Sequence, residues 1–186
     1  MITWVREDIW AFDVQAALKE ISEQRREQAL KFKYEQGQRL CVLAYLLLKQ
    51  ALREGYGITE NPVFEYNEHG KPSIVGHSEI YFNLSHCKEA AICVVSNQPV
   101  GVDVEGIREY RESLVNYTMN DEEITLIKSA ENHAAAFIRL WTMKEATTKL
   151  IGTGISNDMK TVIDPTKYKY TTVDRQRYIY TICENL

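Results

Sequence analysis

A helix near the C-terminal end of the chain carries a charge where its apolar face should continue. Phe137, Trp141 and Glu145 follow one another at intervals of four residues, so on a helix they lie along one face. Burying a carboxylate in an aromatic stripe costs on the order of several kcal/mol unless a cation, a metal or hydrogen bonds hold it. The alternative, a surface glutamate paired with Lys149 at i+4, gains only about 0.2–0.5 kcal/mol. The pattern therefore predicts a helix whose inner face carries a functional carboxylate.

Two more carboxylates lie some 40 residues earlier, in the V-G-V-D-V-E segment Val100–Glu105. A strand alternates its side chains between two faces, so Asp103 and Glu105 point to one side and the valines to the other. Hard divalent cations prefer oxygen ligands, and Mg²⁺ is often held by one or two carboxylates together with substrate phosphates and water. We therefore expect Asp103, Glu105 and Glu145 to form a metal site for phosphate chemistry. The alternative for D-x-E alone is an edge strand with a solvated acidic face.

Composition limits the class of protein. A length of 186 residues suits one compact domain or two small lobes sharing a core, and 45% hydrophobic residues with 26% charged ones indicate a folded chain. The net charge of −4 argues against general nucleic-acid binding. The four cysteines form no C-x-x-C pair, which favours a reduced compartment. No secretory leader is evident and no apolar run is long enough to span a bilayer, so we expect a cytoplasmic protein.

Hydrophobic periodicity predicts an α+β fold with antiparallel connections, whose two halves join near residue 100. Ser22 is expected to cap a helix and Gly55 to end one. The strands at 90–95 and 100–105 are predicted to form a hairpin, as are the last two strands. Expected helices cover residues 13–21, 22–32, 36–54, 121–129 and 132–150, and expected strands cover 2–5, 63–66, 80–84, 90–95, 100–105, 168–173 and 177–183.

Basic residues gather in an early stretch of this acidic chain. From Arg25 to Arg39, five positive side chains stand against two glutamates, a local charge of +3. Such a patch could bind phosphate groups through charge-assisted hydrogen bonds, or it could be a solvated helix face. Two further candidates are Lys71, in a loop with Gly and Pro, and His86, directly after a predicted strand. The alternative for Lys71 is a plain turn without a ligand, and the alternative for His86 is a structural histidine.

Three sequence blocks, in this order, resemble the signature motifs of one enzyme family. They are Phe82–His86 (F-N-L-S-H), Val100–Glu105 (V-G-V-D-V-E) and Leu140–Lys149, which contains W-x-x-K-E-A-x-x-K. The blocks resemble those of the 4′-phosphopantetheinyl transferases, most closely the long, pseudo-dimeric type that activates peptide and polyketide synthases. Gly70–Pro72 (G-K-P) resembles a further block. The likeness covers roughly residues 20–155, and its second and third blocks are specific only when taken together.

The resemblance implies two similar α+β lobes, residues 1–99 and 100–186, with the active site between them. Enzymes of this family transfer 4′-phosphopantetheine from coenzyme A to a serine of an acyl, peptidyl or aryl carrier protein and release 3′,5′-ADP. The resemblance thus implies transferase activity, coenzyme A as co-substrate, Mg²⁺ as cofactor and an apo carrier protein as partner. We expect a monomer that binds neither nucleic acid nor membranes.

The resemblance also implies roles for individual residues. Asp103, Glu105 and Glu145 would hold Mg²⁺ on the coenzyme A pyrophosphate, and Lys149 would contact phosphate or assist removal of the serine proton. The candidate bases are Glu145, Lys149, Glu122 and a metal-bound water. Glu123 could occupy the family's acidic position in place of Glu122, because the alignment can shift by one residue. Without the resemblance, both glutamates are explained as the acidic first turn of a helix. The expected coenzyme A contacts are Arg25, Arg39, Lys71, Ser85 and His86, with Arg25 and His86 near the 3′-phosphate.

Some features depart from the family pattern. Gln28 stands where members often have a second basic residue on the early helix, and the chain is shorter than many two-lobed members, with a loose match after about residue 156. Two alternatives to the enzyme stay open. One is an inactive paralogue that binds coenzyme A or a carrier protein without catalysis. The other is a structural α+β protein with an acidic face, which would show no Mg²⁺-dependent binding of coenzyme A.

Overall fold

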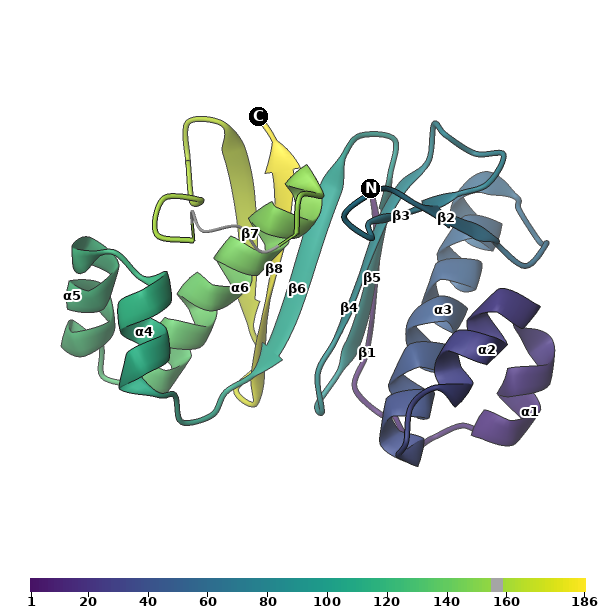
Figure 1. The fold of residues 1–186 in the computed structure, drawn as a ribbon, viewed down its shortest axis with the longest axis horizontal. Coiled ribbons are helices and arrows are strands. Elements are labelled where there is room, and N and C mark those ends of the chain that lie inside the picture. The colour runs from purple at the N-terminus through teal and green to yellow at the C-terminus, as the bar shows by residue number, and fades with distance from the viewer. Residues whose placement is uncertain (155–158) are drawn as a thin grey trace.

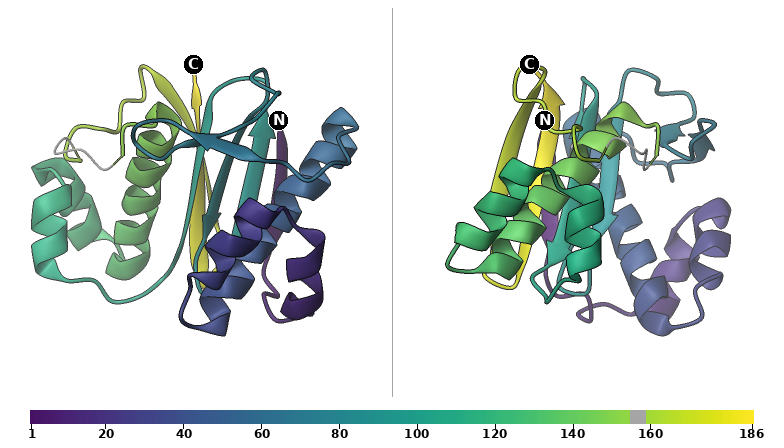
Figure 2. Two further views of the ribbon diagram at one scale, coloured as in Figure 1. Left: turned by 45° about the vertical axis from the view of Figure 1, so that its right-hand side comes forward. Right: turned by 60° about the vertical axis from the view of Figure 1, so that its left-hand side comes forward.

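The computed structural model describes residues 1–154 and 159–186, and within them the chain has a mixed α+β fold with antiparallel sheets. Two three-stranded sheets lie side by side in the middle of the molecule, with α3 against one and α6 against the other (Figures 1 and 2). The predicted fold class, α+β, is confirmed. None of the helices in the described residues is long and apolar enough to cross a membrane.

The helices and strands of the described residues have the following bounds. The helices are α1 (Val14–Glu20), α2 (Glu23–Leu30), α3 (Glu35–Tyr56), α4 (Glu112–Thr118), α5 (Asp121–Ser129) and α6 (His133–Ile151). The strands are β1 (Ile2–Arg6), β2 (Phe64–Tyr66), β3 (Pro72–Ile74), β4 (Tyr81–His86), β5 (Ala91–Ser96), β6 (Val100–Gly106), β7 (Tyr168–Asp174) and β8 (Tyr178–Asn185).

Helix ends follow local side-chain chemistry. Asp13 and Ser22 cap α1 and α2 by accepting hydrogen bonds from backbone N–H groups of the first turn, so the predicted cap at Ser22 is confirmed. The predicted stop at Gly55 is wrong, because α3 continues to Gly57, whose φ of 69° closes the helix. Gly55 instead lies inside α3, where a Cβ would come within 2.1 Å of Ile2 Cδ1. That glycine allows the first strand to pack closely on the helix.

The first sheet has the strand order β1-β5-β4, with β5 antiparallel to both neighbours. All six residues of β5 are buried, which explains the continuous apolar run in the sequence. One face of this sheet packs on α3, where Val42, Tyr45 and Leu48 are fully buried in a core that also contains Phe82 and Cys93. The long helix and this sheet therefore share one hydrophobic core.

The second sheet has the order β6-β8-β7 and carries α6 on one face. The predicted hairpin of the last two strands is confirmed, with β7 and β8 paired from Tyr168↔Asn185 to Asp174↔Ile179. The hydroxyl groups of Thr142 on α6 and Thr181 on β8 are 2.8 Å apart in the interior. This buried pair links the helix to the central strand of its sheet.

The two sheets meet at β4 and β6 through side chains of β4. Asn83 Oδ1 accepts a hydrogen bond from Val102 N (3.0 Å), and Ser85 Oγ accepts one from Val104 N (3.3 Å). These two valines face a buried apolar cluster that also contains Ile92 of β5. The side chains of β4 thus bind the backbone of β6, and this brings the serine of the F-N-L-S-H motif beside the D-x-E motif.

The structure corrects the predicted hairpin between residues 90–95 and 100–105. Both segments are strands, but β5 pairs with β1 and β4, whereas β6 pairs with β8. The connection at residues 97–99 therefore crosses from one sheet to the next. Sequence analysis also missed β3, which lies in the turn-rich stretch with Gly70 and Gly76, and the two-turn helix α4.

Candidate functional site

A cavity of about 630 Å³ is lined by residues of α2, α3, β2–β4, β6 and α6. Eight of the residues predicted to form the site line this one cavity, although they come from segments far apart in the chain. They are Arg25, Lys71, Ser85, His86, Asp103, Glu105, Glu145 and Lys149. The convergence is a property of the fold, because no local pattern places these segments together.

The close approach of α6 to β6 brings the acidic residues of these elements to the same cavity. Gly101, Asp103 and Glu105 share one face of β6, because a strand alternates its side chains. At Gly101 a Cβ would stand 2.0 Å from the carbonyl oxygen of Ala146, so only glycine permits this helix–strand distance. The missing side chain therefore lets Glu145 and Lys149 lie over the acidic face of the strand.

Glu145 continues the aromatic stripe, as the sequence predicted. The rings of Phe137 and Trp141 stack with centroids 6.1 Å apart, and Glu145 follows one turn later on the cavity wall. Burial raises the pKa of the Glu145 carboxyl, the negative charges of Asp103 and Glu105 raise it further, and Lys149 opposes them. Glu145 Oε1 is buried without a hydrogen-bond partner in the described part of the chain. A positive ligand at Oε1 would lower the pKa of the carboxyl and would give the unpartnered oxygen a partner.

Asp103, Lys149 and Ser85 form a tight polar group beside Glu145. Lys149 Nζ donates to Asp103 Oδ1 at 2.6 Å and to Ser85 Oγ at 3.0 Å. The hydroxyl of Ser85 in turn donates to the same Asp103 oxygen at 2.9 Å. The lysine therefore pairs with the aspartate of β6 and not with its i−4 neighbour Glu145. This leaves the other Asp103 oxygen, Oδ2, buried and without a partner among the described residues.

These orphaned oxygens fit a hard cation. Buried carboxylate oxygens without partners are costly, and Mg²⁺ takes oxygen ligands of this type. The third predicted ligand, Glu105, lines the same cavity but pairs with Arg108 at 2.7 Å. Across residues 1–154 and 159–186, no group of three or more His, Cys, Asp or Glu side chains is arranged to hold a metal ion. The metal role of Asp103, Glu105 and Glu145 therefore stays a prediction.

The basic residues of the cavity are held by the protein in different ways. Arg25 is buried and donates to Cys41 O from both Nε (3.1 Å) and Nη2 (2.7 Å), while its Nη1 donates to Gln28 Oε1 (3.0 Å). Partial burial, followed by the positive charges of Lys149 and Arg25, lowers the pKa of His86. The histidine beside these cations is therefore biased toward its neutral form, and a bound phosphate would oppose that bias.

Lys71 reaches the cavity from the β2–β3 turn. Its Nζ donates to Leu150 O at 2.7 Å, at the C-terminal end of α6, and burial lowers its pKa. Its carbon stem packs beside Gly152, where a Cβ would meet Lys71 Cδ at 2.6 Å. The carbonyl uses one of the three N–H groups of the ammonium, and the other two have no partner within residues 1–154 and 159–186.

Arg39 is not brought to the cavity with the other predicted basic residues. Its guanidinium forms an ion pair with Glu35 (2.7 Å), donates to Phe12 O (2.7 Å) and stacks over the Trp10 ring at 4.9 Å. It is not among the described residues that line the cavity. The sequence correctly placed Arg39 on a long helix. It did not predict where the side chain points, because that depends on contacts with the segment before α1.

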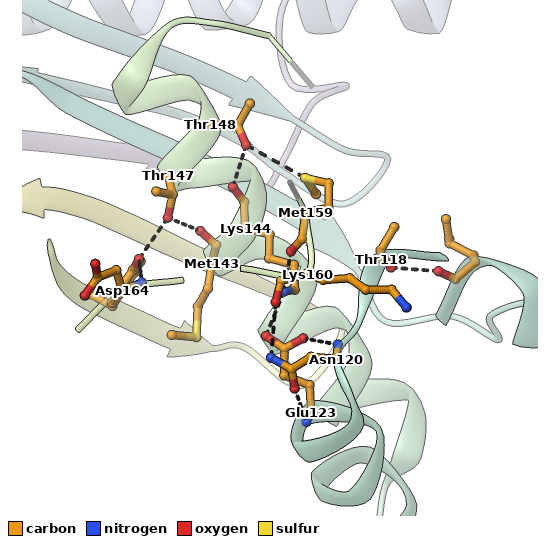
Figure 3. A network of polar contacts seen from close by, with 12 residues as sticks. Thr118, Asn120, Glu123, Met143, Lys144, Thr147, Thr148, Met159, Lys160 and Asp164 are labelled. Carbon is orange, nitrogen blue, oxygen red and sulfur yellow. Dashed lines mark hydrogen bonds and ion pairs between the residues drawn. The ribbon is translucent and has the colours of Figure 1, made fainter. Parts of the chain in front are cut away.

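Neither glutamate of the Glu122/Glu123 pair lines the cavity among the described residues. Glu122 is exposed on α5. Glu123 is buried and completes a capping box with Asn120, as Figure 3 shows. It also pairs at 2.7 Å with the fully buried Lys144, whose Nζ donates to Met159 O at 2.6 Å. Glu123 thus has a structural role, in joining α5 to α6.

Asn83, Gln28 and Arg108 have roles in the site that the sequence did not reveal. Asn83 orients β6 and lines the cavity, while Gln28 fixes the guanidinium of Arg25. Arg108 neutralises Glu105 from the loop after β6. Asn83 gave a sequence signal, since a polar residue within a buried strand is expected to have a specific partner.

Comparison with known proteins leads to the same family as the sequence motifs. Residues 99–183, which contain β6 and α6, match the family described as the 4′-phosphopantetheinyl transferase superfamily. The chain is similar to the 4′-phosphopantetheinyl transferase gsp of Aneurinibacillus migulanus, with 37% identity over 117 residues, which cover 61% of this chain and 48% of that protein. These matches bear out the sequence resemblance to this superfamily.

Two further relatives extend the match into the first half of the chain. The 4′-phosphopantetheinyl transferase psf-1 of Bacillus pumilus is 32% identical over 139 residues, covering 73% of this chain and 60% of that protein. The 4′-phosphopantetheinyl transferase Sfp of Bacillus subtilis (strain 168) is 27% identical over 139 residues, covering 73% and 62%. The chain thus spans less than two thirds of the length of each of these relatives.

Proposed function

We propose that this protein transfers the 4′-phosphopantetheine group of coenzyme A to a serine of an apo acyl or peptidyl carrier protein and releases 3′,5′-ADP. The observation that carries the proposal is the meeting of Asp103, Glu145 and Lys149 in one cavity with Lys71 and His86. Acidic groups for a cation and basic groups for phosphates, in one cavity, are what transfer of a phosphate-linked group requires. The names of the relatives support the same reaction.

Mg²⁺ fits this proposal as the cofactor, with Asp103, Glu105 and Glu145 as its ligands. The orphaned Asp103 Oδ2 and Glu145 Oε1 support the assignment. Glu105 would exchange its ion pair with Arg108 for the metal. When bound, the ion would supply neutralisation of the charge that grows on the pyrophosphate as it leaves.

The residues of the chain would bind, orient and deprotonate the reactants. In the transfer, the serine oxygen forms a bond to the phosphorus nearest the pantetheine, and the bond from that phosphorus to the bridging oxygen breaks, so that 3′,5′-ADP carries away the electron pair. The serine proton passes to a base, and Glu145 and Lys149 are the candidates that line the cavity. Lys149, held by Ser85 and Asp103, would orient the phosphate under attack.

The nucleotide end of coenzyme A would lie against the basic residues of α2, β4 and the β2–β3 turn. We assign Lys71 to the pyrophosphate, and Arg25 with His86 to the 3′-phosphate. Most donor groups of Arg25 are already engaged by Cys41 O and Gln28, so its contribution would come mainly from charge. His86 would then make the more direct contact with the 3′-phosphate.

The proposal extends to the organisation of the chain. We propose that residues 1–99 and 100–186 form two lobes with the site between them and that the protein acts as a monomer in the cytoplasm. In support, each segment contains a long helix packed on a three-stranded antiparallel sheet, α3 on β1-β5-β4 and α6 on β6-β8-β7. Sedimentation of the purified protein at the mass of one chain is the expected result.

Mass spectrometry of a carrier protein tests the reaction directly. The protein is incubated with coenzyme A, Mg²⁺ and a panel of apo carrier proteins, and a reactive carrier should gain about 340 Da, the mass of one phosphopantetheine group. Reactions without coenzyme A or with EDTA are the controls. If every carrier keeps its mass while coenzyme A still binds in calorimetry, the chain is a binding protein and not a transferase. If neither transfer nor binding occurs, the cavity is structural.

A further inference from the structure

The turn between β2 and β3 carries Lys71 to the cavity and is fixed to the end of α6. The Asn67 side chain accepts backbone hydrogen bonds from His69 N (3.0 Å) and Lys71 N (2.8 Å) through Oδ1. Its Nδ2 donates to Gly152 O at 3.1 Å, across 85 residues of sequence. One amide group therefore both shapes the turn and joins it to the helix that carries Glu145.

The contact matters for the position of Lys71. The lysine is the other donor of this turn to the end of α6, through Leu150 O. A ligand phosphate would compete for its ammonium, because charge-assisted hydrogen bonds to phosphate are stronger than those to a carbonyl. If the ammonium moves to the ligand, the hydrogen bond from Asn67 Nδ2 to Gly152 O still holds the turn on α6.

We propose that Asn67 is a positioning residue, which holds Lys71 at the cavity for the phosphate groups of coenzyme A by bridging the β2–β3 turn to Gly152. This inference rests on the function proposed above. Asn67 does not itself line the cavity among the described residues, so its effect on the ligand must pass through the turn. The amide suits this role because it offers an acceptor for the turn and a donor for the bridge at the same time.

Two substitutions separate the turn from the bridge. Asn67→Ser keeps a hydroxyl that can accept from the backbone N–H two residues later, as in ST-turns, but is too short to reach Gly152 O. Asn67→Ala removes both the turn contact and the bridge. If the bridge positions Lys71, the two variants should bind coenzyme A with similarly weakened affinity. A serine variant that binds like the wild type would limit Asn67 to the turn and overturn the inference.

Calorimetric titration with coenzyme A in the presence of Mg²⁺ gives the affinities. Asn67→Ser should weaken binding about threefold to tenfold, the range expected for loss of one hydrogen bond. Asn116→Ser, an exposed asparagine on α4 that does not line the cavity, is the matched control and should bind like the wild type. Asn67 is exposed, so the melting temperatures of these variants should stay within a few degrees of the wild type.

A double-mutant cycle asks whether Asn67 acts through Lys71. In a Lys71→Met background, Asn67→Ser should change the affinity less than about twofold, because the group that it positions is gone. Losses that multiply in the double variant would overturn the inference, since Asn67 would then act independently of Lys71. A wild-type protein that binds no coenzyme A would overturn the proposed function and this inference together. Binding that Asn67→Ser leaves unchanged would overturn this inference alone.

Discussion

Two lysines on consecutive turns of α6 form ion pairs of nearly equal length in different surroundings. Lys144 Nζ lies 2.7 Å from Glu123 and Lys149 Nζ lies 2.6 Å from Asp103. The Lys144 side chain is 0% exposed and its pair is completed by Met159 O and a capping box. The Lys149 side chain is 30% exposed in the cavity, and its partner keeps one buried oxygen without a hydrogen bond.

The difference separates a buried pair with satisfied polar groups from a cavity-lining pair with one unsatisfied oxygen. Burial lowers the pKa of Lys144, and the Glu123 carboxylate opposes part of that shift. Asp103 Oδ2 has no hydrogen-bond partner among the described residues, and burial raises the pKa of the nearby Glu145 carboxyl. A buried pair with all its groups satisfied fixes the fold, whereas an unsatisfied pair facing a cavity has capacity left for a ligand.

The largest effect on transfer is expected at the Lys149–Asp103 pair. Asp103→Ala should lower the transfer rate by about 10³-fold or more, since a group that stabilises charge in the reaction is lost. Glu145→Ala should act similarly. Transfer is measured by the mass gain of the carrier, with melting curves in parallel. If the melting temperature of Asp103→Ala collapses along with the rate, the comparison fails, because this pair would then be structural as well.

The Lys144–Glu123 pair should show the opposite behaviour. Lys144→Met leaves Glu123 buried without its cation and should lower the free energy of unfolding by about 3–5 kcal/mol. Urea denaturation measures the loss. The matched variant that combines Lys144→Met with Glu123→Gln removes both charges but keeps an acceptor for the capping box, and should recover part of the stability. Equal instability of the single and double variants would argue that packing, not charge, is decisive here.

A smaller effect is expected at the proposed 3′-phosphate contact. His86→Ala should weaken binding of coenzyme A about tenfold, as expected for a charge-assisted hydrogen bond, and binding of 3′-dephospho-coenzyme A less than about twofold. Calorimetry with both ligands gives the two ratios. Equal losses of affinity for the two ligands would show that His86 contacts a part of coenzyme A other than the 3′-phosphate.

The smallest effect is expected at Glu122. This side chain is exposed on α5 and does not line the cavity among the described residues, so Glu122→Gln should change the transfer rate less than about twofold. Steady-state rates with saturating carrier protein provide the measurement. A loss of 100-fold, on the order of that seen for a general base, would restore Glu122 as a catalytic residue.

Sequence reasoning succeeded where the determining information was local. Caps such as Ser22, the period of the aromatic stripe before Glu145 and the alternation at Asp103 are set by neighbouring residues, and the structure shows each of them. The candidate site followed from motifs whose side chains point to the same cavity. Their catalytic and metal-binding roles stay predictions.

Sequence reasoning failed where the answer depends on distant partners. The alternation of β5 and β6 shows that both are strands but not which strands they pair with, and β5 has both edges taken by β1 and β4. The charge of Arg39 is evident, yet its direction is set by Trp10 and Phe12 of another segment. Partner choice of this kind is a tertiary property that pattern and propensity do not contain.

The absence of a side chain at Gly101 has a consequence for how the candidate site tolerates substitution. Even one added methyl group there would push α6 outward, because the obstructing atoms belong to the helix main chain and have no rotamer into which they could withdraw. Such a shift would separate Asp103 from Lys149 without altering any chemically active side chain. The distance between these two charged groups is thus controlled from a position that has no side chain of its own.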